Sequence, residues 1–206
     1  MFIAQEIDAE TASGGTAPED VARAQLYRLL AGLLGAAPDT QTLDAVASLR
    51  GDHTPLGEAL SRLAGEASGV GSDQLATDYQ QLFIGLGRGE LVPYASYYLT
   101  GFLHEKPLAR LREDMDRLGV ARGEGVVEPE DHVASVLELM AGLIDGSLVP
   151  GADDARQLRF YETHIGSWLP YFFRDLAASP SSSFYAAVGA VGVEFMSIEQ
   201  RAFEMV

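Results

Sequence analysis

The chain has 206 residues, of which 47% are hydrophobic, enough apolar material for one folded domain or two closely joined halves. Its 30 acidic residues against 14 basic ones give a formal net charge of -16, which would repel nucleic acid and anionic lipid at ordinary salt. The absence of cysteine excludes disulfides, thiolate metal sites and cysteine nucleophiles.

No segment has the length and apolarity of a membrane span. The longest apolar run, residues 184–193, is interrupted by Glu194 and falls well short of the roughly 18 residues that a span requires. Residues 1–10 are acidic and lack the basic segment of a secretory signal. We therefore expect a soluble, cytoplasmic protein that does not insert stably into a membrane.

Helical signals begin after a polar N-terminal segment. Residues 1–15 combine acidic residues with Ser13 and a glycine pair, and we expect them to form a disordered tail. Thr16 and Glu19 have the spacing of a capping box, with Pro18 in the first turn. Apolar residues then recur at intervals of three and four, which indicates a helix with one buried face. These residues are Ala22, Leu26, Leu29, Leu30, Leu33 and Leu34.

Comparable patterns predict further helices to the end of the chain. Thr54 and Pro55 have the character of a cap and a first-turn proline. Three glycines within residues 85–89 stop the fourth helix, because each costs a helix about 1 kcal/mol. No segment alternates apolar and polar residues as a strand would. The expected helices cover about 18–34, 40–50, 55–67, 72–86, 96–105, 107–118, 129–144, 152–178 and 182–204.

These patterns predict an all-α fold, with a single globular domain of about 8–10 helices. A hinge is expected near residues 85–95, where glycines and Pro93 interrupt the helices. The helical domain should cover residues 16–206. Within it we expect an N-terminal helical group to about residue 87, a hinge over 88–95 and a C-terminal helical group over 96–206.

Three kinds of functional site are poorly supported by the sequence. None of the four histidines has a glutamate three residues before it, as the metal ligands of helical bundles require. The glycine-rich residues 85–89 follow a helix and lack the lysine and hydroxyl residue of a phosphate loop. The N-terminal third is acidic, unlike a DNA-binding helix-turn-helix. We expect no metal, no cofactor and no nucleic-acid partner.

Two other segments favour peptide binding. Residues 79–85 place aromatic and aliphatic side chains ahead of a proline and tyrosine-rich loop, which suits an adaptable apolar groove, although the same residues could be ordinary core. Residues 128–132 have the pattern of a helix start, with Pro129 at the first position and acids in the first turn. His132 is not explained by that pattern, so a ligand contact or a pH response stays open.

Taken together, these segments resemble the TorD/DmsD family of chaperones, the redox enzyme maturation proteins. The resemblance rests on the order and spacing of several short motifs and covers the chain from about Pro18. The motifs are Tyr79-x-x-Leu82-Phe83-x-Gly85, Pro93-Tyr94-x-Ser96, Glu128-Pro129-x-Asp131-His132, His164-Ile165-x-x-Trp168-x-Pro170-x-Phe172 and Phe184-Tyr185.

The resemblance implies an all-helical cytoplasmic chaperone, not an enzyme, without catalytic residues or a cofactor of its own. Family members bind the twin-arginine leader and the apo form of a molybdopterin-containing oxidoreductase, and they prevent export until its cofactor is inserted. Some members form domain-swapped dimers, so a monomer and a homodimer both stay open. The implied peptide-binding residues are Tyr79, Leu82, Phe83, Gly85, Pro93, Tyr94, Ser96, Glu128, Pro129, Asp131 and His132.

The chain also departs from the family pattern. Val92 replaces a common proline and Ala95 stands where glutamate is common, so the client could differ from the best-known ones. Trp168 is interpreted as a core residue. Two alternatives are kept: a chaperone for a membrane-associated reductase subunit without leader recognition, and a helical nucleotide- or metal-binding enzyme that uses the glycine run and His132.

Overall fold

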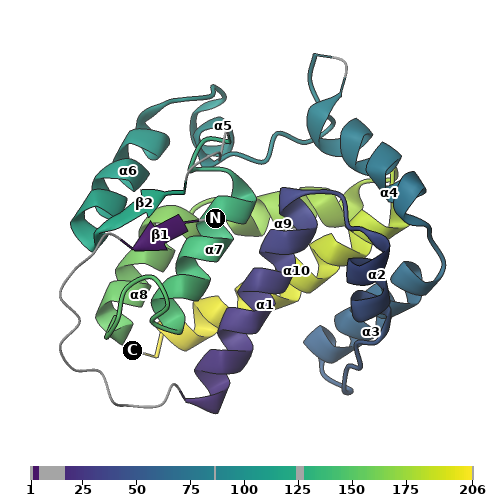
Figure 1. Ribbon diagram of the computed structural model, residues 1–206, viewed down its shortest axis with the longest axis horizontal. Helices are drawn as coiled ribbons and strands as arrows, with labels where there is room; N and C mark the ends of the chain where they lie inside the picture. Colours follow the sequence, from purple (N-terminus) through teal and green to yellow (C-terminus); the bar gives the residue numbers. More distant parts are fainter. Residues whose placement is uncertain (1, 5–16, 86, 124–127, 206) are drawn as a thin grey trace. The chain divides into compact units, whose positions relative to one another are not determined.

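Helices make up nearly all the regular structure, which confirms the predicted all-α fold. The computed structural model describes residues 2–4, 17–85, 87–123 and 128–205 (Figure 1). No helix in these ranges has the length and apolarity needed to cross a membrane. The elements are β1 (Phe2–Ala4), α1 (Pro18–Gly35), α2 (Thr40–Ala47), α3 (Pro55–Ser68), α4 (Ser72–Tyr79), η1 (Gln80–Ile84), α5 (Ala95–Thr100), α6 (Lys106–Leu118), β2 (Val120–Arg122), α7 (Val133–Ile144), α8 (Asp154–Phe160), η2 (Tyr161–Ile165), α9 (Leu169–Ala178) and α10 (Ser183–Phe203).

Two short strands are exceptions to the helical pattern. β1 pairs antiparallel with β2, with Phe2 opposite Arg122 and Ala4 opposite Val120, and the Phe2 side chain is buried. The expectation of a disordered tail is therefore wrong for residues 2–4, while the rest of that predicted tail lies outside the described residues. Alternation could not reveal these strands, because three residues are too few to establish a period of two.

The chain forms two compact units that are interleaved along the sequence. The first unit runs to Gly35 and resumes over Tyr94–Ser167, whereas the second combines Ala36–Pro93 with Trp168–Met205. The chain changes units at Pro93, inside the expected hinge, but it also does so at Gly35 and Ser167. This arrangement differs from the two successive groups expected from the sequence. Helical periodicity locates a buried face but does not identify the helix that covers it.

The first unit is built on α1 and α7, which pack against each other along their lengths (Figure 1). Tyr27, Leu30 and Leu34 of α1 are buried, as are Val136 and Met140 of α7. Each such side chain contributes about 1.5–3 kcal/mol by leaving water. At the C-terminal end of α7, the Asp145 Oδ2 atom lies 2.6 Å from Arg28 Nη1 of α1.

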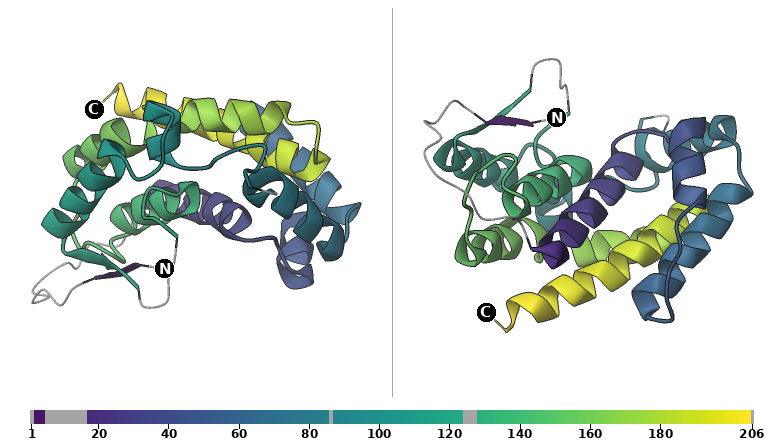
Figure 2. Two further views of the ribbon diagram at one scale, coloured as in Figure 1. Left: turned by 90° about the horizontal axis from the view of Figure 1, so that it is seen from above. Right: turned by 60° about the horizontal axis from the view of Figure 1, so that its bottom comes forward.

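The second unit is built on α10, which packs against α9 and α3 (Figure 2). Trp168 is 1% exposed, which confirms its interpretation as core. Two glycines of α10 allow α9 to approach closely. A Cβ atom at Gly189 would lie 2.4 Å from the Ala177 nitrogen, and one at Gly192 would lie 2.0 Å from the Phe173 ring.

Two of the expected helices contain a wide π-helical turn. The helix expected over residues 72–86 is α-helical only to Tyr79, and it ends in η1, where the Gly85 amide donates to the Gln80 carbonyl at 2.7 Å. The helix expected over 152–178 is likewise divided, since η2 follows α8 and the Gly166 amide donates to the Tyr161 carbonyl. Such turns insert one residue into a helix and are frequent at functional sites.

One of the two helix caps expected from the sequence is confirmed. The Thr54 hydroxyl accepts a hydrogen bond of 3.1 Å from the Gly57 amide at the start of α3, with Pro55 in the first turn. This contact satisfies a backbone donor that the helix itself leaves unpaired. The other expected cap, Thr16, lies outside the described residues.

Replacing Gly189 with alanine should destabilise the second unit. The added Cβ would meet the backbone of α9, and overpacking of this kind costs about 1–3 kcal/mol. We expect a lower midpoint of urea unfolding, followed by circular dichroism. Gly65→Ala in α3 is the control, because nothing lies within 4 Å of its added Cβ and losing a helical glycine stabilises by about 1 kcal/mol. Equal midpoints for the two variants would contradict the close approach of α9 and α10.

Candidate functional site

The two motif segments of the first unit meet at the start of α5. Tyr94 and His132 form an antiparallel backbone bridge, and the Ala95 amide donates to the Asp131 carbonyl at 3.0 Å. The Ser96 amide donates to Asp131 Oδ2 at 2.8 Å. Asp131 thus caps the first turn of a helix that lies 35 residues earlier in the chain, and it binds residues 94–96 to residues 128–132.

His132 is the N-cap of α7, which begins at Val133. Its Nδ1 accepts a hydrogen bond of 3.3 Å from the Ala134 amide, so the neutral ring carries its proton on Nε2. The expected helix start with Pro129 in the first position is therefore wrong, because residues 129–131 precede the helix. Burial lowers the pKa of His132 from 6.5 to about 4, although Glu128 and Asp131 oppose this shift.

The segment before α7 is also held by ion pairs. Both Nε and Nη2 of Arg112 lie within 2.9 Å of Glu130 Oε2, and Arg122 Nε lies 3.8 Å from Glu130 Oε1. Burial raises the pKa of the Glu130 carboxyl, but the hydrogen bonds and positive charge of Arg112 more than offset this, so the pKa lies below its ordinary 4.5. Glu130 therefore serves to fix the segment.

Tyr94 and Glu128 form the accessible edge of this arrangement. The Tyr94 hydroxyl donates a short hydrogen bond to Glu128 Oε2, and the Tyr94 ring lies edge-on to His132 with 5.0 Å between centroids. Glu128 is exposed and Tyr94 is half-buried, whereas Ser96, Asp131 and His132 are buried. Within this group, Tyr94 and Glu128 are therefore the side chains that solvent reaches.

The remaining predicted residues belong to the second unit. The rings of Tyr79 and Phe83 lie 5.0 Å apart, and the buried Tyr185 ring is 5.5 Å from Phe83. Tyr79 and Phe83 are half-buried, whereas Leu82 and Pro93 are buried.

Gly85 follows η1 with φ +63, where a Cβ would lie 2.1 Å from the Arg88 carbonyl oxygen. This turn explains why residue 85 is a glycine. The predicted set thus separates into one group in each unit.

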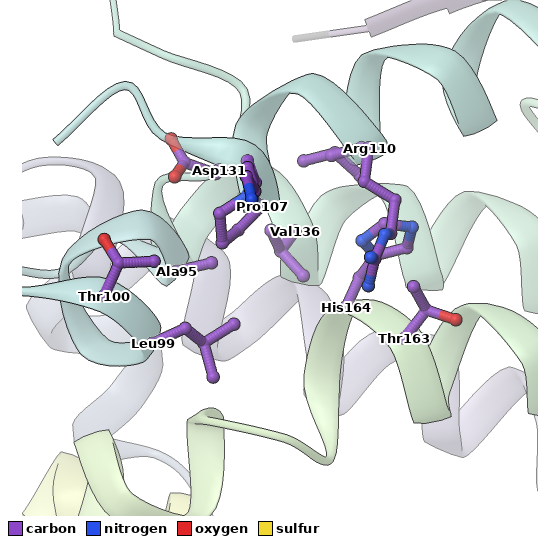
Figure 3. Close-up of a pocket in the computed structure, with 11 residues that line it drawn as sticks. Ala95, Leu99, Thr100, Pro107, Arg110, Asp131, Val136, Thr163 and His164 are labelled. Carbon is purple, nitrogen blue, oxygen red and sulfur yellow. The ribbon is translucent and has the colours of Figure 1, made fainter. Parts of the chain in front are cut away.

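A cavity of about 220 Å³ lies beside Asp131, entirely within the first unit (Figure 3). Its walls come from α5, the start of α6, the start of α7 and η2. They include Leu99, Lys106, Arg110, Val136 and His164. Apart from Asp131, no predicted site residue lines it. Among the other lining residues, His164 belongs to a motif noted in the sequence, which assigns it no role.

His164 lines this cavity from η2. Its Nε2 lies 2.7 Å from Asp114 Oδ2 of α6. Burial lowers the pKa of His164, Asp114 works in the opposite direction, and the positive charge of Arg110 lowers the pKa further. No cluster of three or more histidine, aspartate or glutamate side chains that could hold a metal ion occurs in the described part of the chain.

The model of one protein family, the nitrate reductase delta subunit, matches residues 49–174. The chain belongs to this family. Chaperone protein TorD of Aliivibrio fischeri is 27% identical over 86% of this chain and 92% of its own length. Chaperone protein TorD of Shewanella loihica is 28% identical over 90% and 94% respectively.

The fold of this nitrate reductase delta family member has a solved counterpart. A structure described as a redox enzyme maturation protein from Archaeoglobus fulgidus aligns with a TM-score of 0.57 over 93% of this chain and 99% of that chain, at 21% identity. The predicted TorD/DmsD resemblance is confirmed, and the chain is a TorD-type redox enzyme maturation chaperone. The names of its relatives agree with the prediction that it is not an enzyme.

His132 should make the fold less stable in acid. Its pKa of about 4 lies below the ordinary 6.5, so the unfolded chain binds more protons than the folded one between these values. The stability that the neutral cap contributes is complete above the ordinary pKa. It is lost as pH falls towards the folded pKa, by up to about 3 kcal/mol. Urea unfolding at closely spaced pH values measures this slope.

His132→Asn should flatten that slope, because asparagine can cap the helix but does not titrate. Part of the slope should remain, since the pKa of His164 is also lowered. His53→Asn, at an exposed position in the second unit, controls for the loss of a histidine. An unchanged slope in His132→Asn would contradict the buried neutral cap.

Proposed function

We propose that this chain is a cytoplasmic chaperone for a molybdopterin-containing oxidoreductase. It binds the twin-arginine leader or the apo form of that client and prevents export until the cofactor is inserted. Family membership carries this proposal, since the relatives that match most of the chain are named chaperone protein TorD. The mechanism is binding and release, without a chemical reaction on the client.

The Tyr94–Glu128 edge supports binding of the arginine pair. A guanidinium can form two parallel hydrogen bonds with a carboxylate, and Glu128 is an exposed carboxylate that already accepts a hydrogen bond from Tyr94. The net charge of -16 favours the approach of a basic peptide. The buried Ser96, Asp131 and His132 act as positioning residues that hold the edge in place.

Aromatic residues of the second unit support binding of the leader's apolar stretch. Tyr79 and Phe83 are half-buried and rest on the buried ring of Tyr185. Aromatic rings fixed in this way supply contact area at little conformational cost. Leu82 is 0% exposed, so its role in leader binding is to support η1.

A second candidate function is favoured by the description of the matching family. The words "nitrate reductase delta subunit" suit a chaperone that binds a folded part of a membrane-associated reductase subunit and does not recognise a leader. Size-exclusion chromatography of the chain with leaderless client separates the candidates. Co-elution with leaderless client, combined with no affinity for the leader peptide, would favour this second function.

Glu128→Gln should weaken binding of a synthetic leader with paired arginines about fivefold, the equivalent of about 1 kcal/mol. The reason is loss of an anionic acceptor at an exposed site. Isothermal titration calorimetry with purified chain measures the dissociation constant. A second leader, with both arginines replaced by glutamine, completes a double-mutant cycle, and Glu128→Gln should not affect its binding.

Glu162→Gln is the matched control, since Glu162 is an exposed acid of the same unit that does not belong to the edge. It should bind both leaders as the unaltered chain does. If Glu128→Gln weakens the arginine and glutamine leaders equally, Glu128 is not the arginine acceptor. If no leader binds the unaltered chain, leader recognition itself fails.

A further inference from the structure

The cavity of the first unit contains two cationic side chains without an anionic partner. Lys106 and Arg110 both line it and both are exposed. Among the described residues, neither side chain makes a hydrogen bond or an ion pair. The chain has 30 acidic residues and 14 basic ones, so carboxylates outnumber the cations that could pair with them.

Asp114 is the natural partner for Arg110, one turn further along α6. Its carboxylate is already occupied: Oδ2 lies 2.7 Å from His164 Nε2, and Oδ1 accepts from Arg117. The Arg110 side chain instead reaches towards His164 in the cavity wall (Figure 3). Its positive charge is felt there, since it lowers the pKa of His164. The local arrangement therefore keeps Arg110 available to a ligand.

Lys106 is the first residue of α6. It follows the N-cap Glu105, whose side chain makes no capping hydrogen bond, and the first turn itself contains no acid. A positive charge at this end is unfavourable for the helix, because it adds to the positive end of the helix dipole. Lys106 and Arg110 are one turn apart on α6. Together they give one side of the cavity a positive character, although the chain as a whole is strongly negative.

Exposed apolar side chains occur at Leu99, in the cavity lining, and on the turn that follows α5. Leu99 lines the cavity and is 44% exposed, and Phe102 and Leu103 nearby in sequence are 70% and 45% exposed. The turn that carries them is fixed: the Thr100 hydroxyl donates to the Ser96 carbonyl at 2.8 Å and accepts from the Phe102 amide at 3.2 Å. Exposed apolar side chains on a fixed turn are typical of a protein contact surface.

We propose that this cavity binds a polypeptide segment in which a glutamate or aspartate stands next to a bulky apolar residue. The carboxylate pairs with Lys106 and Arg110, and the apolar side chain contacts Leu99 and its neighbours. Charge complementarity identifies this occupant, because two unpaired cations favour an anion. The same cations disfavour the arginines of a leader.

Asp131, the acid of the cavity wall, does not prevent this pairing. Its Oδ2 is occupied by the Ser96 amide, and in Figure 3 Pro107 stands between Asp131 and Arg110. The occupant is therefore a part of the client outside its leader, and in this respect the inference rests on the proposed function. The chain would hold the client at two chemically different places.

Fluorescence anisotropy with a short synthetic peptide of leucine and glutamate tests the proposal. Two reference peptides accompany it, one with glutamine in place of glutamate and one with glycine in place of leucine. We expect the leucine–glutamate peptide to bind more tightly than either reference and more weakly at high salt. The double variant Lys106→Gln, Arg110→Gln should bind it about tenfold more weakly.

Arg156→Gln with Arg159→Gln is the matched control, because it removes two positive charges from α8 of the same unit, outside the cavity lining. This control should bind the leucine–glutamate peptide as the unaltered chain does. Circular dichroism checks that both double variants are folded. Equal weakening in both would mean that only net charge matters, which would overturn the proposal.

The same proteins are titrated with the twin-arginine leader, so that the two hypotheses fail separately. If the leader binds but the leucine–glutamate peptide does not, the cavity proposal is wrong and the proposed function stands. If the peptide binds with the expected loss in the double variant while no leader binds, the cavity proposal stands and leader recognition fails. A change of oligomeric state in the double variant, with unchanged peptide binding, would make a second copy of the chain the occupant and overturn the proposal.

Discussion

The candidate site depends on the hydrogen bond that the buried carboxylate of Asp131 accepts from the Ser96 amide. Asp131 is 1% exposed, and a charge withdrawn from water in this way is costly unless it is hydrogen-bonded. The Ser96 amide meets that need, and in return α5 obtains a cap that Tyr94 does not supply. This exchange fixes Tyr94 beside Glu128 and also builds one wall of the neighbouring cavity.

Sequence patterns predict the structure correctly where a short segment determines its own conformation. The cap at Thr54 and the burial of Trp168 follow from residues close in the chain. The apolar face expected on α1 is correct in part: Leu30, Leu33 and Leu34 are buried, whereas Ala22 is exposed and Leu26 and Leu29 are half-buried. Sequence patterns fail where contacts between residues distant in the chain determine the local structure. Pro129 and the two acids after it predict a helix start at residue 129, four residues before α7 begins, and His132 is not among the residues that usually cap a helix. His132 has an extended backbone and pairs with Tyr94, so the helix begins after it.

The cavity is a second feature that depends on residues distant in the chain. Its lining joins residues 95–111 with 131–136 and 163–164, and no local pattern signals that these will meet. The sequence also could not predict that Arg110 has no anionic partner within the ranges that the structure describes. It shows Asp114 one turn away, but it does not show that His164 and Arg117 already pair with that carboxylate. Motif resemblance therefore identifies the family and singles out Tyr94 and Glu128, whereas the cavity can be recognised only in the three-dimensional structure.

The chain passes from one unit to the other after Gly35, Pro93 and Ser167. These three positions determine how the protein can be divided into fragments. A gene fragment that ends at Pro93 would encode α1 without α7, and α3 without α9 and α10, so both cores would lose their principal helices. Neither unit corresponds to a continuous stretch of DNA. Two gene segments, one for each unit, joined end to end would therefore not encode this arrangement, and neither unit is a single uninterrupted segment of the chain.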